Sequence, residues 1–184
     1  MGSGKTTLGR ALHGAIGPGG VRLRFVDLDE AVEQAEDASV TEIFSRKGEA
    51  YFRRLESDTL RQLAATSGTV VACGGGTPCQ PGNMEWMNAN GLTVLLRASD
   101  EALLRRLSEG AARRPLIAGL SPDELSRFIA AKQAERQPFY SQAALTFPSD
   151  LLETADEIAA SRQRFLKLIE CHMKCCLLYT SDAA

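Results

Sequence analysis

The first residues of the chain have the types that a phosphate-binding loop requires. Gly4-Lys5-Thr6 ends the pattern G-x-x-x-x-G-K-[ST], which places small residues before the N-terminus of a helix. Backbone N–H groups in such a loop surround a phosphate, and the helix dipole favours the same anion. The lysine contacts the β- and γ-phosphates, and the hydroxyl binds Mg²⁺. We therefore expect Lys5 to be catalytic, Thr6 to bind the metal, and the following residues to form an ATP site: Gly2, Ser3, Gly4, Lys5, Thr6 and Thr7.

Two carboxylates follow a segment with strand character at residues 21–26. Asp27 and Asp29 come directly after this run. In an open α/β sheet, ligands bind at the carboxyl ends of the strands. The alternative is a pair of acidic residues that only stabilises the start of the next helix through its dipole. A role at a ligand site is favoured because the same chain carries a phosphate-binding loop.

Three consecutive glycines, Gly74, Gly75 and Gly76, follow a short apolar run at residues 70–73. A plain turn needs fewer glycines than this. A glycine-rich loop after a strand allows a substrate to approach the backbone closely. We expect this loop to contribute to the same site.

Alternating strand and helix segments must position these residues. Strands are predicted at 21–26, 70–73, 92–96 and 145–147, and helices at 8–16, 30–66, 81–91, 100–109, 121–136 and 154–170. The long helical region is expected to break near residues 37–39 and at Gly48, and Ser121 with Glu124 predicts a capping box. This alternation predicts an α/β fold with a parallel sheet and right-handed crossovers.

Composition narrows the classes of function. The 184 residues suffice for one α/β core, and 21 Lys+Arg against 23 Asp+Glu argue against a nucleic-acid binder. No apolar run approaches the roughly 20 residues that a bilayer-spanning helix needs. The odd count of 5 cysteines does not indicate a secreted disulfide framework, so we expect a cytoplasmic protein and, by default, a monomer.

The order and spacing of the motifs resemble those of the shikimate kinase family across about residues 1–170. The matching runs are Gly2-Ser3-Gly4-Lys5-Thr6-Thr7, Phe25-Val26-Asp27-Leu28-Asp29, Gly48-Glu49 followed by Phe52-Arg53-Arg54-Leu55-Glu56, Gly74-Gly75-Gly76, Arg114-Pro115-Leu116, and Arg136 with Pro138 and Tyr140. The resemblance implies a single three-layer P-loop kinase domain at 1–170, with a parallel sheet of order 2-3-1-4-5 and helices on both faces. It also implies ATP-dependent phosphorylation of the 3-hydroxyl of shikimate, on the route to chorismate and the aromatic amino acids.

The resemblance also assigns roles to single residues. Asp27 helps to hold Mg²⁺, often through water, and Asp29 binds the substrate hydroxyls and orients or deprotonates the attacking one. Arg53 and Arg136 bind the shikimate carboxylate, a contact that suits two planar guanidinium groups. Glu56, one helical turn beyond Arg53, can orient that arginine.

Further implied roles concern two loops and one helical region. The glycines Gly74, Gly75 and Gly76 contact shikimate, with Gly75 as the main contact. Arg114 lies in a lid at about residues 110–120, where it contacts ATP and stabilises the transferring phosphoryl group. Residues 30–66 form the substrate-binding helical region.

The chain also departs from the family pattern. The first glycine of the phosphate-binding motif and the strand before it would precede residue 1, so strand 1 of the sheet is expected to be missing. The sheet then has a central gap, or two strands close over about 10 Å to pair. The run at residues 149–154 lacks a basic residue, so no adenine contact is assigned, and residues 171–184 are expected to be a non-native tail.

Other interpretations stay open at this point. One is a related small-molecule kinase, such as a gluconate or nucleotide kinase. Another is a catalytically silent module that binds shikimate and has lost nucleotide binding. A metal site among Cys171, His172, Cys175 and Cys176 is disfavoured, since the spacing does not match common zinc patterns.

Overall fold

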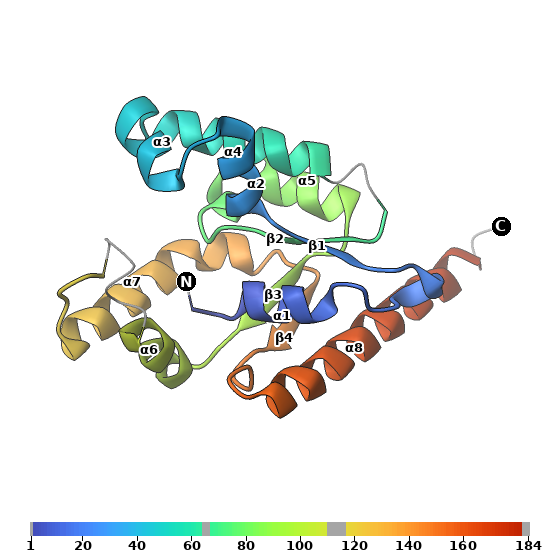
Figure 1. Cartoon of the computed structure of the whole chain (residues 1–184). Helices are drawn as coiled ribbons and strands as arrows, with labels where there is room; N and C mark the ends of the chain where they lie inside the picture. The colour runs from blue at the N-terminus through green and yellow to red at the C-terminus, as the bar shows by residue number, and fades with distance from the viewer. Residues whose placement is uncertain (1, 64–66, 110–116, 182–184) are drawn as a thin grey trace.

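The computed structural model describes residues 2–63, 67–109 and 117–181, with side chains described as far as residue 174 (Figure 1). Strands and helices alternate along the chain, as predicted. The strands are β1 (Arg24–Asp27), β2 (Thr69–Ala72), β3 (Val94–Arg97) and β4 (Leu145–Pro148). The α-helices are α1 (Lys5–Leu12), α2 (Leu28–Glu36), α3 (Val40–Lys47), α4 (Glu49–Leu63), α5 (Asn83–Asn90), α6 (Asp100–Glu109), α7 (Pro122–Tyr140) and α8 (Ala155–Ser181). Two short 3-10 helices are η1 (Pro18–Gly20) and η2 (Thr77–Cys79).

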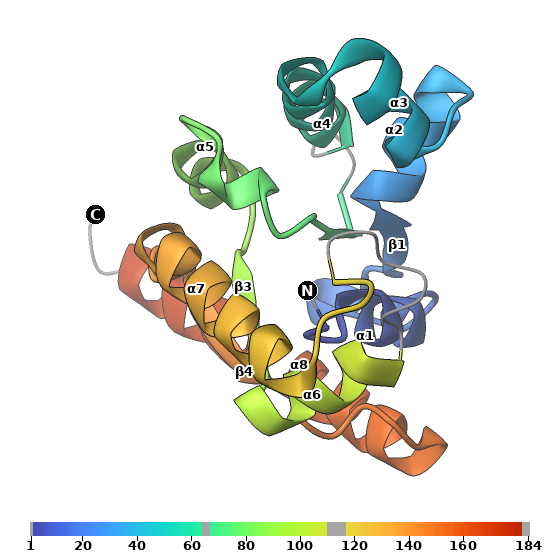
Figure 2. The ribbon, with the colours of Figure 1, turned by 90° about the vertical axis from the view of Figure 1, so that its left-hand side faces the viewer.

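The described strands form two parallel pairs, which confirms the predicted parallel arrangement. β1 pairs with β2 so that Asp27 lies opposite Ala72, and β3 pairs with β4 so that Arg97 lies opposite Pro148. Figure 2 shows β1 apart from β3 and β4, which lie on the other side of the view. Because β1 and β2 are parallel, their carboxyl ends place the two predicted ligand-binding loops next to each other.

Between the two pairs lies a cavity rather than a closed sheet. Among the described residues no pairing joins β2 to β3, so the gap is the outcome observed of the two that the sequence left open. The cavity has a volume of about 1000 Å³, and apolar residues of both edges line it, including Val71 and Leu95. The predicted order 2-3-1-4-5 counts the missing strand as strand 1, so β1 to β4 correspond to its strands 2 to 5. Both observed pairings, β1 with β2 and β3 with β4, agree with this order. The position of strand 1 stays a prediction.

Helices α1 and α8 pack together over one side of the strands. Leu8 and Leu12 of α1 are buried with Phe165 and Ile169 of α8 and Phe147 of β4. The Phe147 and Phe165 rings meet edge to face, with centroids 5.2 Å apart. This cluster fixes the start of α1, and therefore the phosphate-binding loop, against the β3–β4 pair.

Local signals explain how the helical region 28–63 is divided. Ser39 caps α3 in a capping box with Glu42, and Gly48 has φ 80° at the end of α3. The rings of Phe44 and Phe52 then pack with centroids 4.7 Å apart, so α3 lies against α4. Figure 1 shows α2, α3, α4 and α5 gathered at the top of the molecule. Both predicted breaks are confirmed.

Several element boundaries differ from the sequence prediction. Helix α1 begins at Lys5 and ends at Leu12, whereas a helix over residues 8–16 was predicted. Gly14, with φ 75°, then turns the chain, and the N–H of Gly14 donates to the carbonyl of Leu23 (2.8 Å). Because of that turn, β1 begins at Arg24 and not at the predicted residue 21.

Two helices run further than predicted. Helix α7 continues through Pro138 to Tyr140, and α8 continues past residue 170 to Ser181. No glycine or proline stands between residues 171 and 181 to end α8. None of the helices in the described residues is long and apolar enough to cross a membrane.

Candidate active site

The glycine loop before α1 presents its backbone to the site. Gly2 and Gly4 have φ angles of 73° and 82°, in the left-handed region that favours glycine. A Cβ on Gly4 would lie 2.5 Å from Leu152 Cδ1, so the loop is also packed too tightly there for a side chain. Arg106 holds the outer end of the loop by donating to the Gly2 carbonyl (3.3 Å). Helix α1 therefore begins with free N–H groups behind a fixed turn, which is the geometry that anion binding requires.

Lys5, the first residue of α1, faces the cavity that also reaches Gly74, Gly75 and Arg136. Enclosure of its ammonium lowers the pKa of Lys5, while the Asp29 and Asp27 carboxylates beside it raise the pKa by smaller amounts. A bound phosphate would favour the charged form of Lys5, since an opposite charge offsets the desolvation. Binding of an anion would therefore stabilise the charged form of this enclosed lysine.

Thr6 and Asp27, which were both predicted to hold the metal, lie in direct contact. The Thr6 hydroxyl donates to Asp27 Oδ2 (2.8 Å), and Asp27 Oδ1 accepts from the backbone N–H of Asp29 (3.1 Å). Hydroxyl and carboxylate oxygens are the ligand types that Mg²⁺ prefers. The pair therefore fits a hard cation.

Asp29 stands in the first turn of α2, directly after β1. It is exposed at the edge of the site, yet the surrounding atoms restrict its hydration. This desolvation is the main reason that the pKa of Asp29 is raised above 3.8, and the carboxylates of Asp27 and Glu56 raise it further. A raised pKa makes Asp29 a better proton acceptor than an ordinary aspartate.

The glycine loop at 74–76 is the point where the other predicted residues meet. A Cβ on Gly74 would lie 3.3 Å from Asp29 Oδ1, and a Cβ on Gly75 would lie 2.4 Å from Arg136 Nη1. A Cβ on Gly76 would lie 2.9 Å from Arg53 Nη1. Consecutive Cα atoms are only about 3.8 Å apart. The structure therefore brings Asp29, Arg53 and Arg136 around one short loop.

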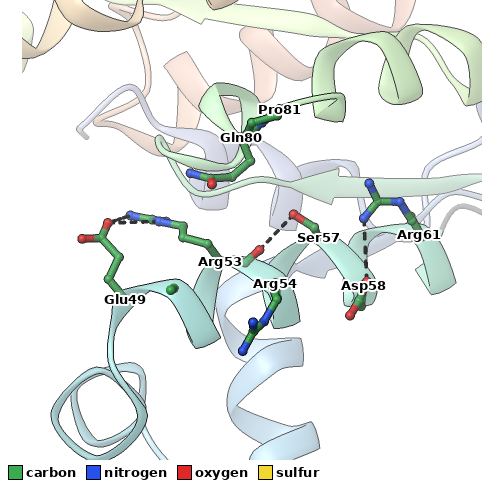
Figure 3. A pocket seen from close by; sticks show the side chains of 9 residues that line it. Glu49, Arg53, Arg54, Ser57, Asp58, Arg61, Gln80 and Pro81 are labelled. Carbon is green, nitrogen blue, oxygen red and sulfur yellow. Dashed lines mark hydrogen bonds and ion pairs between the residues drawn. The ribbon is translucent and has the colours of Figure 1, made fainter.

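Arg53 extends along α4 toward Glu49, while Arg54 points away from it (Figure 3). The Nη1 of Arg53 donates to Glu56 (3.1 Å), and the Nε and Nη2 of Arg53 donate to Glu49 (3.3 and 3.1 Å). The side chain of Glu56 is 1% exposed, whereas that of Glu49 is 67% exposed. Glu56 therefore anchors Arg53, and Glu49 forms the weaker, solvent-screened pair.

The outer side of this arginine opens onto a shallow groove between α4 and the turn that follows η2. The groove has a volume of about 710 Å³, and Gln80 and Pro81 form its far side (Figure 3). Arg61 also lines it, paired with Asp58 (3.8 Å). Three arginines and two acidic residues line the groove: Arg53, Arg54, Arg61, Glu49 and Asp58.

Arg136 lies on α7, which packs against η2. It forms no ion pair within the part of the chain that the structure describes, although its guanidinium lies against Gly75. Tyr140, one turn later, donates its hydroxyl hydrogen to the Gly75 carbonyl (2.8 Å). Two arginines thus flank the loop, one paired with carboxylates and one not.

Sequence reasoning gave no role to three residues that support the loop. Thr77 donates its hydroxyl hydrogen to Glu56, and Asn83 Nδ2 donates to the Thr77 carbonyl (2.9 Å) and to Ser57 Oγ (3.0 Å). Tyr140 is the third. The Thr77 and Asn83 side chains are buried, and their partners lie on other elements, so no local pattern marks them. Tyr140 could have been found, because it stands in the run with Arg136 and Pro138.

Two further residues bear on the chemistry. Burial raises the pKa of the Cys73 thiol to about 12, so Cys73 stays protonated and is no nucleophile at neutral pH. Arg114, expected in the lid, lies outside the described residues.

The run at residues 149–154, to which no adenine contact was assigned, has its acidic side chains paired within the protein. Asp150 accepts from the backbone N–H of Ser99 (2.7 Å), and Glu153 pairs with Arg105 and Arg106.

Comparisons with known proteins agree with this geometry. The model of the family described as shikimate kinase matches residues 1–167. A shikimate kinase from Bacteroides thetaiotaomicron is 41% identical over 170 residues, which cover 92% of this chain and 94% of that protein.

Solved structures show the same similarity. The crystal structure of shikimate kinase from B. thetaiotaomicron has a TM-score of 0.84 at 40% identity and covers 92% of this chain and 94% of its own. A shikimate kinase from Acinetobacter baumannii in complex with shikimate has a TM-score of 0.75 at 29% identity and covers 94% and 89%.

Proposed function

We propose, because the chain belongs to the shikimate kinase family, that it transfers the γ-phosphoryl group of ATP to the 3-hydroxyl of shikimate. The observation that carries this proposal is the loop at 74–76, around which Asp29, Arg53 and Arg136 meet. The cavity between the strand pairs reaches Lys5, Gly75 and Arg136, and Arg53 lies against the next glycine of the loop. These contacts support a phosphate on the α1 loop and a carboxylate between the two arginines.

Residues 2–7 hold the ATP phosphates in this proposal. Their backbone N–H groups bind the β-phosphate, and Lys5 neutralises charge on the β- and γ-phosphates. Thr6 and Asp27, whose side-chain oxygens lie 2.8 Å apart, would hold Mg²⁺. The ion supplies charge neutralisation at the phosphates. Asp27 contributes directly or through water.

Arg53 and Arg136 bind the carboxylate of shikimate. Arg53 gives up its exposed partner Glu49 and keeps its buried partner Glu56, because the exposed pair costs less to break. Arg136, which has no carboxylate partner among the described residues, is available to the substrate directly. Gly74, Gly75 and Gly76 allow the ring of the substrate to approach the backbone between the two arginines.

Asp29 orients the acceptor hydroxyl and takes its proton as the bond to phosphorus forms. Its raised pKa suits this step, because the carboxylate must be ionised to accept and basic enough to hold the proton. Phosphoryl transfer through a loose transition state asks little more of a base than this. The phosphates of ATP favour the charged form of Lys5, because they offset the desolvation that lowers its pKa.

Arg114 completes the site in our proposal. Its place in the Arg114-Pro115-Leu116 run supports a lid arginine that arrives with ATP and stabilises the transferring group. We also propose that residues 1–170 form the catalytic domain of a monomer and that the protein works in the cytoplasm. The net charge of −2 supports small-molecule substrates over nucleic acid.

A panel of acceptors tests the proposal against the related kinases. ADP formation from Mg·ATP is measured with shikimate, gluconate and a nucleoside monophosphate as separate acceptors. We expect turnover with shikimate alone. Turnover with gluconate or the nucleotide at a similar rate would contradict the assignment of Arg53 and Arg136.

A silent binding module makes a different prediction. Calorimetry would then show shikimate binding without ATP binding, and no ADP would form. We expect both ligands to bind, because the glycines of the loop at residues 2–5 have the left-handed conformation, which suits a loop whose backbone N–H groups bind phosphate.

A further inference from the structure

Tyr140 ends α7, one helical turn after Arg136. Its hydroxyl donates to the carbonyl of Gly75 over 2.8 Å, across 65 positions of the chain. The side chain is partly buried. This bond therefore joins the helix that carries one proposed carboxylate-binding arginine to the loop that the substrate approaches.

The guanidinium of Arg136 and the hydroxyl of Tyr140 lie at the same point of this loop. A Cβ on Gly75 would lie 2.4 Å from Arg136 Nη1 and 3.2 Å from the Tyr140 oxygen. Burial raises the pKa of Tyr140, which the neighbouring Arg136 lowers by less. The phenol therefore stays a hydrogen-bond donor at neutral pH.

The loop is fixed to α4 by separate contacts. Thr77 donates to the buried Glu56, and Glu56 accepts from Arg53. Through these bonds the position of Arg53 depends on the η2 end of the loop. The position of Gly75 relative to α7, and so to Arg136, depends on Tyr140.

We propose that Tyr140 is a positioning residue for shikimate, because its bond to Gly75 sets the spacing between Arg53 and Arg136. This role rests on the proposed function, in which Tyr140 has no catalytic or substrate-binding part. A carboxylate bound by two guanidinium groups requires a defined distance between them. Removal of the hydroxyl leaves both arginines in the chain and lets the loop move away from α7.

The test compares Tyr140→Phe with Tyr51→Phe. The Tyr51 hydroxyl donates to Glu36 of α2 (2.7 Å) and accepts from Lys47 (3.2 Å), so its variant loses tyrosine hydrogen bonds away from the glycine loop. We expect Tyr140→Phe to raise the KM for shikimate about three- to tenfold, the effect of one lost hydrogen bond. The KM for ATP should stay within about twofold, and Tyr51→Phe should match the unchanged protein.

A double-mutant cycle with Arg136→Ala separates positioning from general support of the fold. If Tyr140 acts through the spacing of the arginines, its removal should change shikimate affinity by less than about twofold once Arg136 is absent. Equal effects in both backgrounds would overturn the proposal. So would an unchanged KM, or loss of the cooperative unfolding transition in Tyr140→Phe.

Calorimetric binding of shikimate distinguishes failure of this inference from failure of the proposed function. If the unchanged protein binds shikimate without turnover, the phosphotransferase is refuted, and the dissociation constants of the same variants still test Tyr140. If it neither binds nor turns over shikimate, both proposals fall. Turnover with a Tyr140→Phe variant of unaltered affinity overturns the Tyr140 inference alone.

Discussion

Each glycine of the 74–76 loop lies against a different charged side chain. Gly74 faces Glu56 and Asp29, Gly75 faces Arg136, and Gly76 faces Arg53. A methyl group at any of the three positions would meet one of these side chains at 2.4 to 2.9 Å. Here the absence of side chains is a requirement of packing against functional groups, because none of these three glycines has a positive φ.

The substitution Gly75→Ala tests this reading. The new methyl would displace the end of the Arg136 side chain, which can move without disturbing the core. We expect the KM for shikimate to rise at least about tenfold, because hydrogen bonds to charged groups contribute about 1.5–3 kcal/mol. Thermal stability should change little. Gly91→Ala is the matched control, since its nearest neighbour would be a carbonyl at 3.9 Å. Similar kinetics for the two variants would refute the role of Gly75.

Arg53 and Arg54 provide an internal comparison for the carboxylate site. Arg53→Ala should raise the KM for shikimate about 10- to 100-fold and the KM for ATP far less, since about 1.5–3 kcal/mol is lost with a charged hydrogen-bond partner. Arg54 points away from Arg53 and is exposed, so Arg54→Ala should change neither constant (Figure 3). Steady-state kinetics with each substrate varied in turn measures both. An equal rise for ATP and shikimate would count against the assignment.

The raised pKa of Asp29 predicts a link between pH, activity and stability. The acidic limb of kcat/KM should lie above pH 3.8, and Asp29→Asn should remove it and lower kcat by at least about 100-fold. For stability, a raised pKa in the folded state means that protonated Asp29 favours folding. That contribution is full below pH 3.8 and is lost as the pH rises through the folded-state value.

Asp29→Asn should therefore unfold at higher urea than the unchanged protein at pH 7, and at about the same urea at pH 3. Urea unfolding at the two pH values measures this difference. A destabilised variant at pH 7 would show that Asp29 supports the fold instead of being strained by it.

The places of single residues were predictable where a local pattern carries the chemistry. The phosphate-binding motif puts Lys5 and Thr6 at the start of α1, and the end of β1 puts Asp27 beside Thr6. Tyr140 stands in a recognised run, but its partner Gly75 lies 65 positions away. Thr77 was not assigned a role, because it acts through Glu56, 21 positions away. A hydrogen bond over such a separation leaves no periodic trace in one sequence.

Caps and glycine breaks set the element boundaries, and these were the most predictable parts of the fold. Ser121 accepts from the N–H of Glu124, whose carboxylate accepts from the Ser121 N–H (2.8 Å), and Pro122 stands at the first position of α7. The same chemistry places Ser39 before α3. The turn at Gly14 was missed because it depends on backbone hydrogen bonds to residue 23.

The cap of α7 can be tested without touching the site. Ser121→Ala should lower the free energy of unfolding by about 1 kcal/mol, because it removes the side-chain acceptor of the Glu124 N–H. Both KM values should stay unchanged, since Arg136 lies four turns away along the helix. Ser126→Ala, an exposed position in the same helix, serves as control in urea unfolding. Equal midpoints for the two variants would show that the capping box contributes nothing.

The cavity between β2 and β3 is the main departure of the molecule from a closed sheet. It has a volume of about 1000 Å³, with Val70 and Val71 on one edge and Leu95 and Leu96 on the other. Extended strands with unpaired backbone groups on facing edges accept a further strand between them at about 4.8 Å spacing. The predicted order 2-3-1-4-5 places a strand at this position.

An N-terminal extension tests that order. A five-residue apolar strand followed by the first glycine of the phosphate-binding motif should raise the urea midpoint and the m-value, because folding would bury more apolar surface. A glycine–serine extension of the same length is the control. Equal shifts for the two extensions would argue that the cavity does not take a strand.

The most direct test of the function is shikimate-dependent release of ADP from Mg·ATP, measured on this chain and on the strand-extended form. We expect ADP to accumulate in both only when shikimate is present, with one shikimate 3-phosphate formed for each ADP. Release of ADP that is independent of shikimate in both proteins, while both unfold cooperatively, would contradict the assignment of the site around Gly75.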